Sequence, residues 1–297
     1  MRKVFAVAAA VVVLSLVPVP ALAWGAAAHR FIMRRAIEML PPEIKPFFAA
    51  NADELVMRVT DPDLWRTVGW DDDPNHFVNF GAPELGEFPF PALPREYGAA
   101  LEKFGASALK RLGTLPWREE EESGNLRRAM EGFKRNQPFS IGNTVLFASV
   151  ASHYIQDACQ PLHASNNFDG QFTNQNGVHA RFETALFERF QSRLAIKPAP
   201  AAPVASARDA AFDALLSSYQ QVDPLLAADK AAIAGKDAYD DEYFEKFFSG
   251  VKSILERQLS AAITATGSMI LGAWQQAGRP GLKTEMPRII QKVRPPK

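Results

Sequence analysis

Side chains that can bind a metal ion are concentrated in one short stretch of this sequence. The stretch reads His153-x3-Asp157-x5-His163-x15-His179-x3-Glu183, and it holds three of the five histidines of the chain. On an α-helix, residues four apart project from the same face, so each close pair would point toward a common position. Imidazole combined with carboxylate suits a borderline cation such as zinc, whereas calcium requires mainly oxygen ligands. The spacing therefore predicts a metal site that two helices build.

The two other histidines also lie near residues that could complete such a site. His29 follows Trp24 by five positions, and His76 follows the run Asp71-Asp72-Asp73. The alternative is a set of core histidines that neighbouring carboxylates satisfy. That alternative explains a single pair more easily than it explains the whole set.

The elements that must position these residues have the pattern of helices. Helical periodicity and strong helix formers predict helices at residues 28–40, 96–112, 118–135, 178–194, 207–221 and 240–276. Residues 138–160 are apolar on all sides, which predicts a buried central helix that ends at Pro161. No stretch alternates as a strand does. The sequence therefore predicts an all-α fold, a single multi-helix domain with the metal site between helices.

Segments of other composition separate or flank these helices. Residues 61–95 and 164–177 are expected to be loops, residues 197–206 a surface linker and residues 283–297 a flexible tail. Residues 1–23 have the pattern of a signal peptide, with a basic start, a short apolar stretch and the cleavage signal Ala21-Leu22-Ala23. We therefore expect a mature domain of residues 24–297 without a transmembrane segment, exported to the periplasm or the cell exterior.

Charge and cysteine content limit the partners of the chain. It carries 33 basic and 33 acidic residues, so no overall positive field attracts a polyanion. This balance disfavours a long nucleic acid as the substrate without excluding it. Cys159 is the only cysteine and is expected to be a buried, small apolar residue. No disulfide can form within the chain. Bound metal is therefore a candidate for the cross-link that stabilises an exported fold in place of a disulfide.

The order of the metal-capable residues resembles that of a known family. Trp24, His29, Asp63 and His76, followed by the run from His153 onward, resemble the superfamily of bacterial zinc-dependent phospholipases C and fungal single-strand-specific nucleases. The resemblance covers residues 24–190. It implies an all-helical phosphodiesterase that holds three zinc ions per chain, and we expect the protein to act as a monomer.

The resemblance also implies how the ligands divide among the zinc ions. The first zinc would take Asp63, His76, His153 and Asp157, and the second would take His163, His179 and Glu183. The third would take the Trp24 amino nitrogen and carbonyl oxygen, His29, and Asp157 as a bridge. Zinc in such a site activates water at neutral pH and stabilises the oxygens of an in-line displacement. Because the Trp24 amine exists only after cleavage behind Ala23, export and completion of the site would be coupled.

Further residues match substrate-contacting positions of the family. The pattern Asp63-x-x-Arg66 resembles that of the nucleases, which implies catalytic roles for both residues and a phosphate contact for the arginine. Phe77 matches a position that stacks on the substrate base, and Asn79 stands where the nucleases carry a base-reading aspartate. The plainer interpretations are a surface ion pair for Arg66 and a core aromatic for Phe77.

Some features of the sequence resemble the nucleases of this superfamily, and others resemble its phospholipases. The short gap from Trp24 to His29 and the Asp63-x-x-Arg66 pattern resemble the nucleases, whereas Glu183 and the short 164–178 loop resemble the phospholipases. We favour phospholipase C-type cleavage of phospholipid head groups, with peripheral contact to a membrane. The alternative is a single-strand-specific nuclease that cleaves DNA and RNA phosphodiesters. A second alternative is a non-catalytic exported zinc-binding protein.

Overall fold

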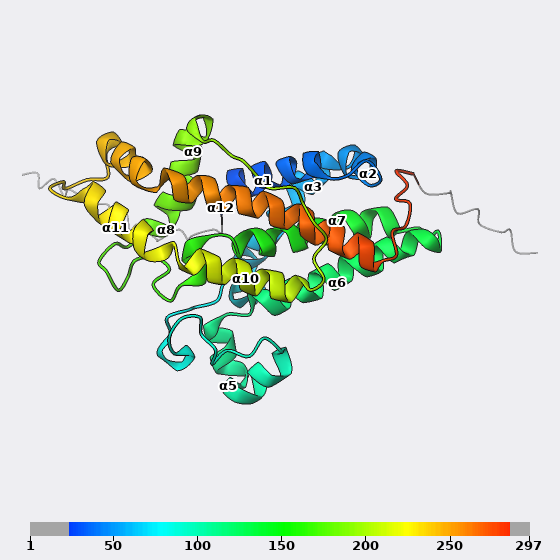
Figure 1. The fold of residues 1–297 in the computed structure, drawn as a ribbon, viewed down its shortest axis with the longest axis horizontal. Helices are drawn as coiled ribbons and strands as arrows, with labels where there is room; N and C mark the ends of the chain where they lie inside the picture. The colour runs from blue at the N-terminus through cyan, green and yellow to red at the C-terminus, as the bar shows by residue number, and fades with distance from the viewer. Residues whose placement is uncertain (1–23, 286–297) are drawn as a thin grey trace, which may run out of the picture.

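The computed structural model describes residues 24–285 of the 297-residue chain, and it is built from helices (Figure 1). Within these residues there is no strand, so the predicted all-α fold is confirmed. The signal peptide expected at residues 1–23 and the tail residues 286–297 lie outside the described range. Between residues 24 and 285, no helix combines the length and the apolar character that crossing a membrane requires.

A long buried helix, α7 (Ser140–Asp157), lies at the centre of the fold. It packs most extensively against α6 (Leu115–Lys134), and α1 (Ala26–Met39), α3 (Ala52–Arg58) and α12 (Asp241–Gln276) cover it from other directions. Figure 1 shows α12 running lengthwise over α7. Helix α7 can be enclosed in this way because its residues are apolar on all sides. Its last turn, which carries His153 and Asp157, is therefore removed from water.

Two apolar cores meet at the end of α7. One core contains Tyr154 and Ile155 together with side chains of α2 (Lys45–Ala50), α3 and α6. The other contains Trp24, Cys159 and Leu162 together with side chains of α1, α11 (Val222–Ile233) and α12. The metal-capable residues near the end of α7 lie where these two cores join, and Cys159 is buried as expected.

The expected loop at residues 61–95 is partly helical. It contains α4 (Asp61–Thr67) and the short 3₁₀ turns η1 (Asp73–His76) and η2 (Pro83–Leu85). Pro62 near the start of α4 and the acidic residues of its first turn suit a helix N-terminus. The loop-like composition of the rest of the segment masks this local helix signal.

The remaining elements follow the expected order. These are α5 (Tyr97–Leu112), η3 (Pro161–Ala164), α8 (Val178–Ala180), the π-helical turn η4 (Arg181–Leu186), α9 (Phe187–Phe190), η5 (Gln191–Arg193) and α10 (Ala207–Tyr219). The helix expected at residues 178–194 is thus a series of short helical types rather than one regular helix. Helices α2, α3, α4 and α11 were not expected.

Residues 194–206, here called the strap, run along α12 without regular structure. The strap is fixed to α12 by hydrogen bonds: the Thr264 hydroxyl donates to the Ala199 carbonyl (3.1 Å), and the Ala202 amide donates to Ser268 Oγ (3.1 Å). The segment expected to be a surface linker therefore forms a cover over this helix.

Candidate metal centre

Asp157, the last residue of α7, is the hub of a buried cluster of ionisable side chains. Its Oδ1 lies 3.3 Å from His29 Nε2, and its Oδ2 lies 3.0 Å from His76 Nδ1 and 3.2 Å from His153 Nε2. Asp63 faces the same histidines, with its Oδ1 3.9 Å from His153 Nε2 and 4.0 Å from His76 Nδ1. Four separate elements, α1, α4, η1 and α7, thus direct ligand atoms to one place.

A second group lies beside the first. His163 Nε2 is 3.1 Å from His179 Nε2, which is 2.9 Å from Glu183 Oε2. Glu183 lies on the π-helical turn η4, a type of irregularity that occurs frequently at functional sites. His163 Nδ1 is 3.6 Å from Asp157 Oδ2, so the two groups adjoin.

Backbone carbonyls fix which nitrogen of two histidines carries the proton. His153 Nδ1 donates to the Val59 carbonyl (2.8 Å), and His163 Nδ1 donates to the carbonyl of His76 (2.6 Å). A carbonyl can only accept, so in the neutral rings Nε2 presents an unprotonated lone pair. These lone pairs face the carboxylates and imidazoles of the cluster.

Side chains fix two further histidines in the same manner. His76 Nε2 donates to Asp72 Oδ2 (3.0 Å), and His29 Nδ1 donates to Gln156 Oε1 (2.6 Å). In each case the outer nitrogen is used as a donor, and the inner nitrogen faces Asp157. Metal-binding histidines characteristically have such an outer partner, which holds the tautomer and the ring orientation.

Five buried atoms of the cluster lack a hydrogen-bond partner within the described residues. They are His29 Nε2, Asp63 Oδ1, Asp157 Oδ1, His179 Nδ1 and Glu183 Oε1. Unpartnered buried polar atoms are costly, and lone pairs that face carboxylate oxygens repel one another. The negative end of the α7 dipole adds to this repulsion at Asp157. A bound cation would relieve these costs for the atoms that face the cluster, which His179 Nδ1 does not because the Nε2 of that ring faces His163 and Glu183. The residues present therefore fit a metal centre.

Two residues of the cluster have the protonation states that ligate metal ions. Burial would raise the pKa of Asp157, but the nearby His153 holds the pKa well below its usual range, so the carboxylate stays charged. Burial lowers the pKa of His163 to about 3, so this imidazole is neutral. Charged carboxylates and neutral imidazoles are the forms that ligate metal ions.

For His29, His76 and His179, burial lowers the pKa but neighbouring carboxylates outweigh it and raise the pKa. Burial raises the pKa of Glu183. Metal binding would therefore release protons from these side chains.

The structure brings the expected ligands together in three groups that could each hold a metal ion. Among residues 24–285, these groups are His29–His153–Asp157, Asp63–His76–His153 and His163–His179–Glu183, in each of which the ligand atoms lie within 4.8 Å of one another. The third group matches the set expected for the second zinc. Asp63, His76 and His153 also group as expected, and His29 lies with Asp157. The identity and number of metal ions, and the role of each ligand, stay predictions.

Trp24 lies beside the metal-capable cluster. Its indole Nε1 donates to the carbonyl of Gln156 (2.9 Å), the residue whose side chain holds His29. The next residue must be glycine, because a Cβ at Gly25 would collide with the side chain of Thr184 on η4. This close approach brings the start of the described chain against the turn that carries Glu183. Ligation by the Trp24 amine stays a prediction.

A pocket of about 370 Å³ opens beside the cluster. Its lining combines histidines of the cluster with charged and apolar side chains: Arg66, Asp73, His76, Phe77, Leu162, His163, Phe168 and His179. Arg66 is paired with Asp73, and its Nη1 lies 3.9 Å from Asp63 Oδ1. Arg66 and Phe77 are thus placed beside the cluster.

Asn79 lies apart from this pocket. Its side-chain amide donates to the Arg111 carbonyl (2.8 Å), and its backbone amide donates to the carbonyl of Leu112 (2.7 Å). The structure gives it a role in joining the segment after η1 to the end of α5. A contact between Asn79 and substrate stays a prediction.

Sequence reasoning did not identify the residues that orient the ligands. Asp72 accepts hydrogen bonds from His76 Nε2 and from the Tyr154 hydroxyl (2.8 Å), and Gln160 Nε2 donates to Glu183 Oε2 (2.8 Å). The Asp71-Asp72-Asp73 run was visible, but nothing in the sequence separates its middle residue from its neighbours. The distinction arises because Asp72 alone of the three is buried.

Replacing Asp72 with asparagine should weaken metal binding by about 10–100-fold, because His76 loses its charged acceptor. The measurement is the zinc dissociation constant from competition with a chromophoric chelator. Asp71→Asn is the matched control, since Asp71 is exposed and pairs with Lys110. Equal zinc affinity in the two variants would contradict the orienting role.

Comparison of the sequence with models of known families finds no match, and comparison with curated proteins finds none either. The fold and the site therefore define the class on their own. The chain is an all-helical protein with buried histidine and carboxylate groups that could bind metal ions.

Proposed function

We propose that this protein is a zinc-dependent phosphodiesterase that cleaves phospholipid head groups in the manner of phospholipase C. The observation that carries the proposal is the adjoining arrangement of three potential metal groups around Asp157, with a pocket beside them. Paired metal ions suit in-line displacement at phosphorus because they stabilise both the attacking and the leaving oxygen. A single closed structural site would need neither the adjoining groups nor the pocket.

The residues of the chain have distinct tasks in this proposal. Asp157 would bridge two metal ions and fix their relative positions. Asp63 would complete the ligands of the metal ion nearest Arg66. Zinc bound there would supply Lewis acidity toward the phosphate and a water nucleophile at neutral pH. Arg66 would contact a phosphate oxygen, for which the planar guanidinium is suited. Phe77 and Phe168 would enclose the organic part of the substrate and exclude water.

Exposed apolar side chains on segments that also contribute to the pocket lining support a lipid substrate. Leu64, Val68 and Trp70 lie on or just after α4, the helix that carries Arg66, and are 55%, 69% and 62% exposed. Phe172 lies in the same loop as Phe168 and is 69% exposed. Aromatic and aliphatic side chains of this kind suit the surface of a bilayer, where the substrate resides.

A second candidate function, cleavage of single-stranded nucleic acid, is favoured by the lining of the pocket. Phe77 and Phe168 offer two aromatic faces beside Arg66, and bases of any type can stack on such faces. The neutral overall charge of the chain argues against a long polyanionic substrate. We therefore rank this candidate second.

One preparation tests both functions. Zinc-loaded mature protein should contain about three zinc ions per chain and should release phosphocholine from phosphatidylcholine vesicles faster than it degrades single-stranded DNA. Faster degradation of the DNA would establish the second candidate instead. Full zinc loading without cleavage of either substrate or of bis(p-nitrophenyl) phosphate would favour the non-catalytic zinc-binding protein. A zinc content of one ion or none would contradict the trinuclear centre.

A further inference from the structure

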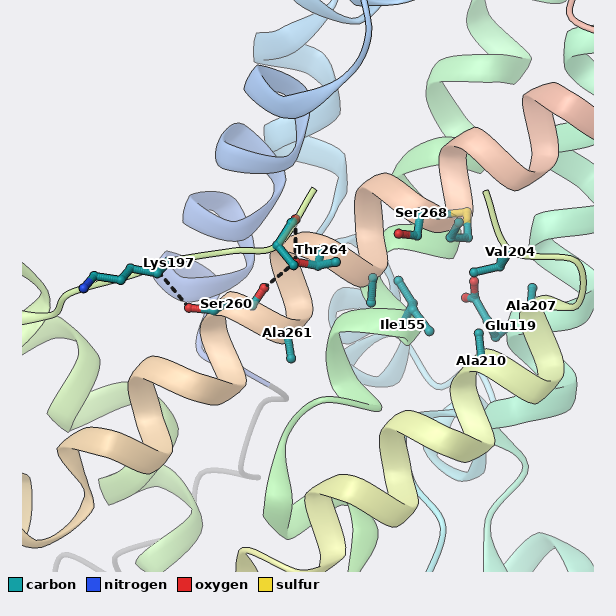
Figure 2. A pocket seen from close by; sticks show the side chains of 13 residues that line it. Glu119, Ile155, Lys197, Val204, Ala207, Ala210, Ser260, Ala261, Thr264 and Ser268 are labelled. Atoms are coloured by element: carbon teal, nitrogen blue, oxygen red, sulfur yellow. Dashed lines mark hydrogen bonds between the residues drawn. The ribbon is translucent and has the colours of Figure 1, made fainter. Parts of the chain in front are cut away.

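A second, mainly apolar pocket lies away from the metal-capable cluster, between α6, α7, α10, α12 and the strap (Figure 2). Its volume of about 430 Å³ falls within the range of sites for small molecules. Most of the lining is apolar, with small side chains such as Ala207, Ala210 and Ala261 and the larger Ile155 and Met269. The strap forms part of its wall, so the hydrogen bonds that fix the strap to α12 also shape this pocket.

One buried acid faces this apolar pocket. Glu119 of α6 is fully buried, and neither of its carboxyl oxygens has a hydrogen-bond partner within residues 24–285. Figure 2 shows the carboxyl group directed toward Val204 of the strap. Its oxygens are closed off from solvent, so a ligand in the pocket would reach them by displacing the strap at this point. Burial, together with the neighbouring Glu122, raises the pKa of Glu119 well above its usual range. An acid left in this state is costly to the fold unless a ligand satisfies it.

The other polar side chains shown in the buried part of this pocket are already paired. Ser260 Oγ donates to the Glu256 carbonyl (2.6 Å), Ser268 Oγ accepts from Ala202, and Thr264 donates to Ala199. Lys197 is exposed and extends away from the other labelled side chains in Figure 2. Glu119 is therefore the group that would determine which ligand enters.

The chemistry of Glu119 selects the class of ligand. Both oxygens lack a donor, so a group with several N–H bonds would satisfy them together. An anion would be repelled by Glu119 and Glu122, and a cation would pair with Glu119 because Glu122 already pairs with Arg118 (3.0 Å). We propose that this pocket binds a small amphiphilic amine, whose ammonium group pairs with Glu119 as the acid releases its proton to solvent, and whose apolar part contacts the alanines and Met269.

This site is separate from the proposed catalytic function. Helix α7 contributes Ile155 to the pocket, two residues from both His153 and Asp157. Residues two apart on a helix project in nearly opposite directions, so the pocket and the cluster occupy different sides of α7. Binding of the amine can thus be measured whether or not the metal centre is catalytic.

Calorimetric titration of the zinc-loaded protein with hexylammonium tests the proposal. We expect saturable binding of one ligand per chain, with hexanol and hexanoate binding at least about tenfold more weakly because they lose the charged hydrogen bonds. Glu119→Gln should weaken hexylammonium binding at least about tenfold for the same reason. Glu120→Gln is the matched control, since Glu120 is exposed on the same helix and should leave binding unchanged.

A second variant keeps the test decisive if Glu119→Gln does not fold. Ala210→Leu retains the acid but fills part of the pocket, and it should reduce the affinity for hexylammonium. Unchanged affinity in Ala210→Leu, or in a folded Glu119→Gln protein, would overturn the proposal. So would equal affinity for hexanol or hexanoate, or no binding of hexylammonium to the unmodified protein.

Discussion

Replacing Asp157 with asparagine should remove most of the bound metal and lower phosphodiesterase activity by more than about 100-fold. Loss of an outer partner of a metal ligand already costs about 10–100-fold, and Asp157 contacts three histidines directly. The amide keeps the size of the side chain but loses the negative charge that holds the cations. The measurements are zinc content by plasma mass spectrometry and the hydrolysis rate of bis(p-nitrophenyl) phosphate.

The matched control for this change is Asp61→Asn. Asp61 begins the same short helix as Asp63, but it pairs with Arg58 (3.4 Å) and belongs to none of the three groups within the described residues. The control protein should retain its full zinc content. If Asp157→Asn also retained full zinc content and activity, Asp157 could not be the bridge between metal ions.

Removing the metal should lower the melting temperature by at least about 10 °C. Each site filled at a hundredfold excess over its dissociation constant stabilises the fold by about 2.7 kcal/mol, and each kcal/mol moves the Tm of a large domain by about 2–4 °C. Two or more sites give the expected shift. Without the cations, the buried carboxylates and the inward lone pairs of the histidines are left to repel one another. The measurement is calorimetric melting with zinc and after removal of zinc with dipicolinate.

The same melting experiment distinguishes a fold that bound metal stabilises from a fold with ordinary core histidines. Because Asp157→Asn removes the proposed bridge between two metal ions, dipicolinate should lower the Tm of that variant less than it lowers the Tm of the unmodified protein. An unmodified protein that melts at the same temperature with and without zinc would show that the cluster contributes no metal-dependent stability.

Much of the site could be predicted from the sequence because the two close pairs are local. His153 with Asp157, and His179 with Glu183, are brought together by the four-residue spacing alone, as their contacts of 3.2 Å and 2.9 Å show. The apolar residues of α7 likewise determined that this helix is buried. Helical periodicity depends only on neighbouring residues, so the fold class could also be predicted.

Contacts between distant residues could be decided only by the tertiary structure. No local pattern shows that His29 lies 3.3 Å from Asp157, or that Asp72 rather than Asp71 or Asp73 supports His76. The pocket around Glu119 depends on how the strap crosses α12, which involves residues far apart in the chain. The sequence by itself determined the residue types and the local pairs that suit a metal site. Packing decided which partners meet, because burial and long-range contacts depend on how whole helices enclose one another.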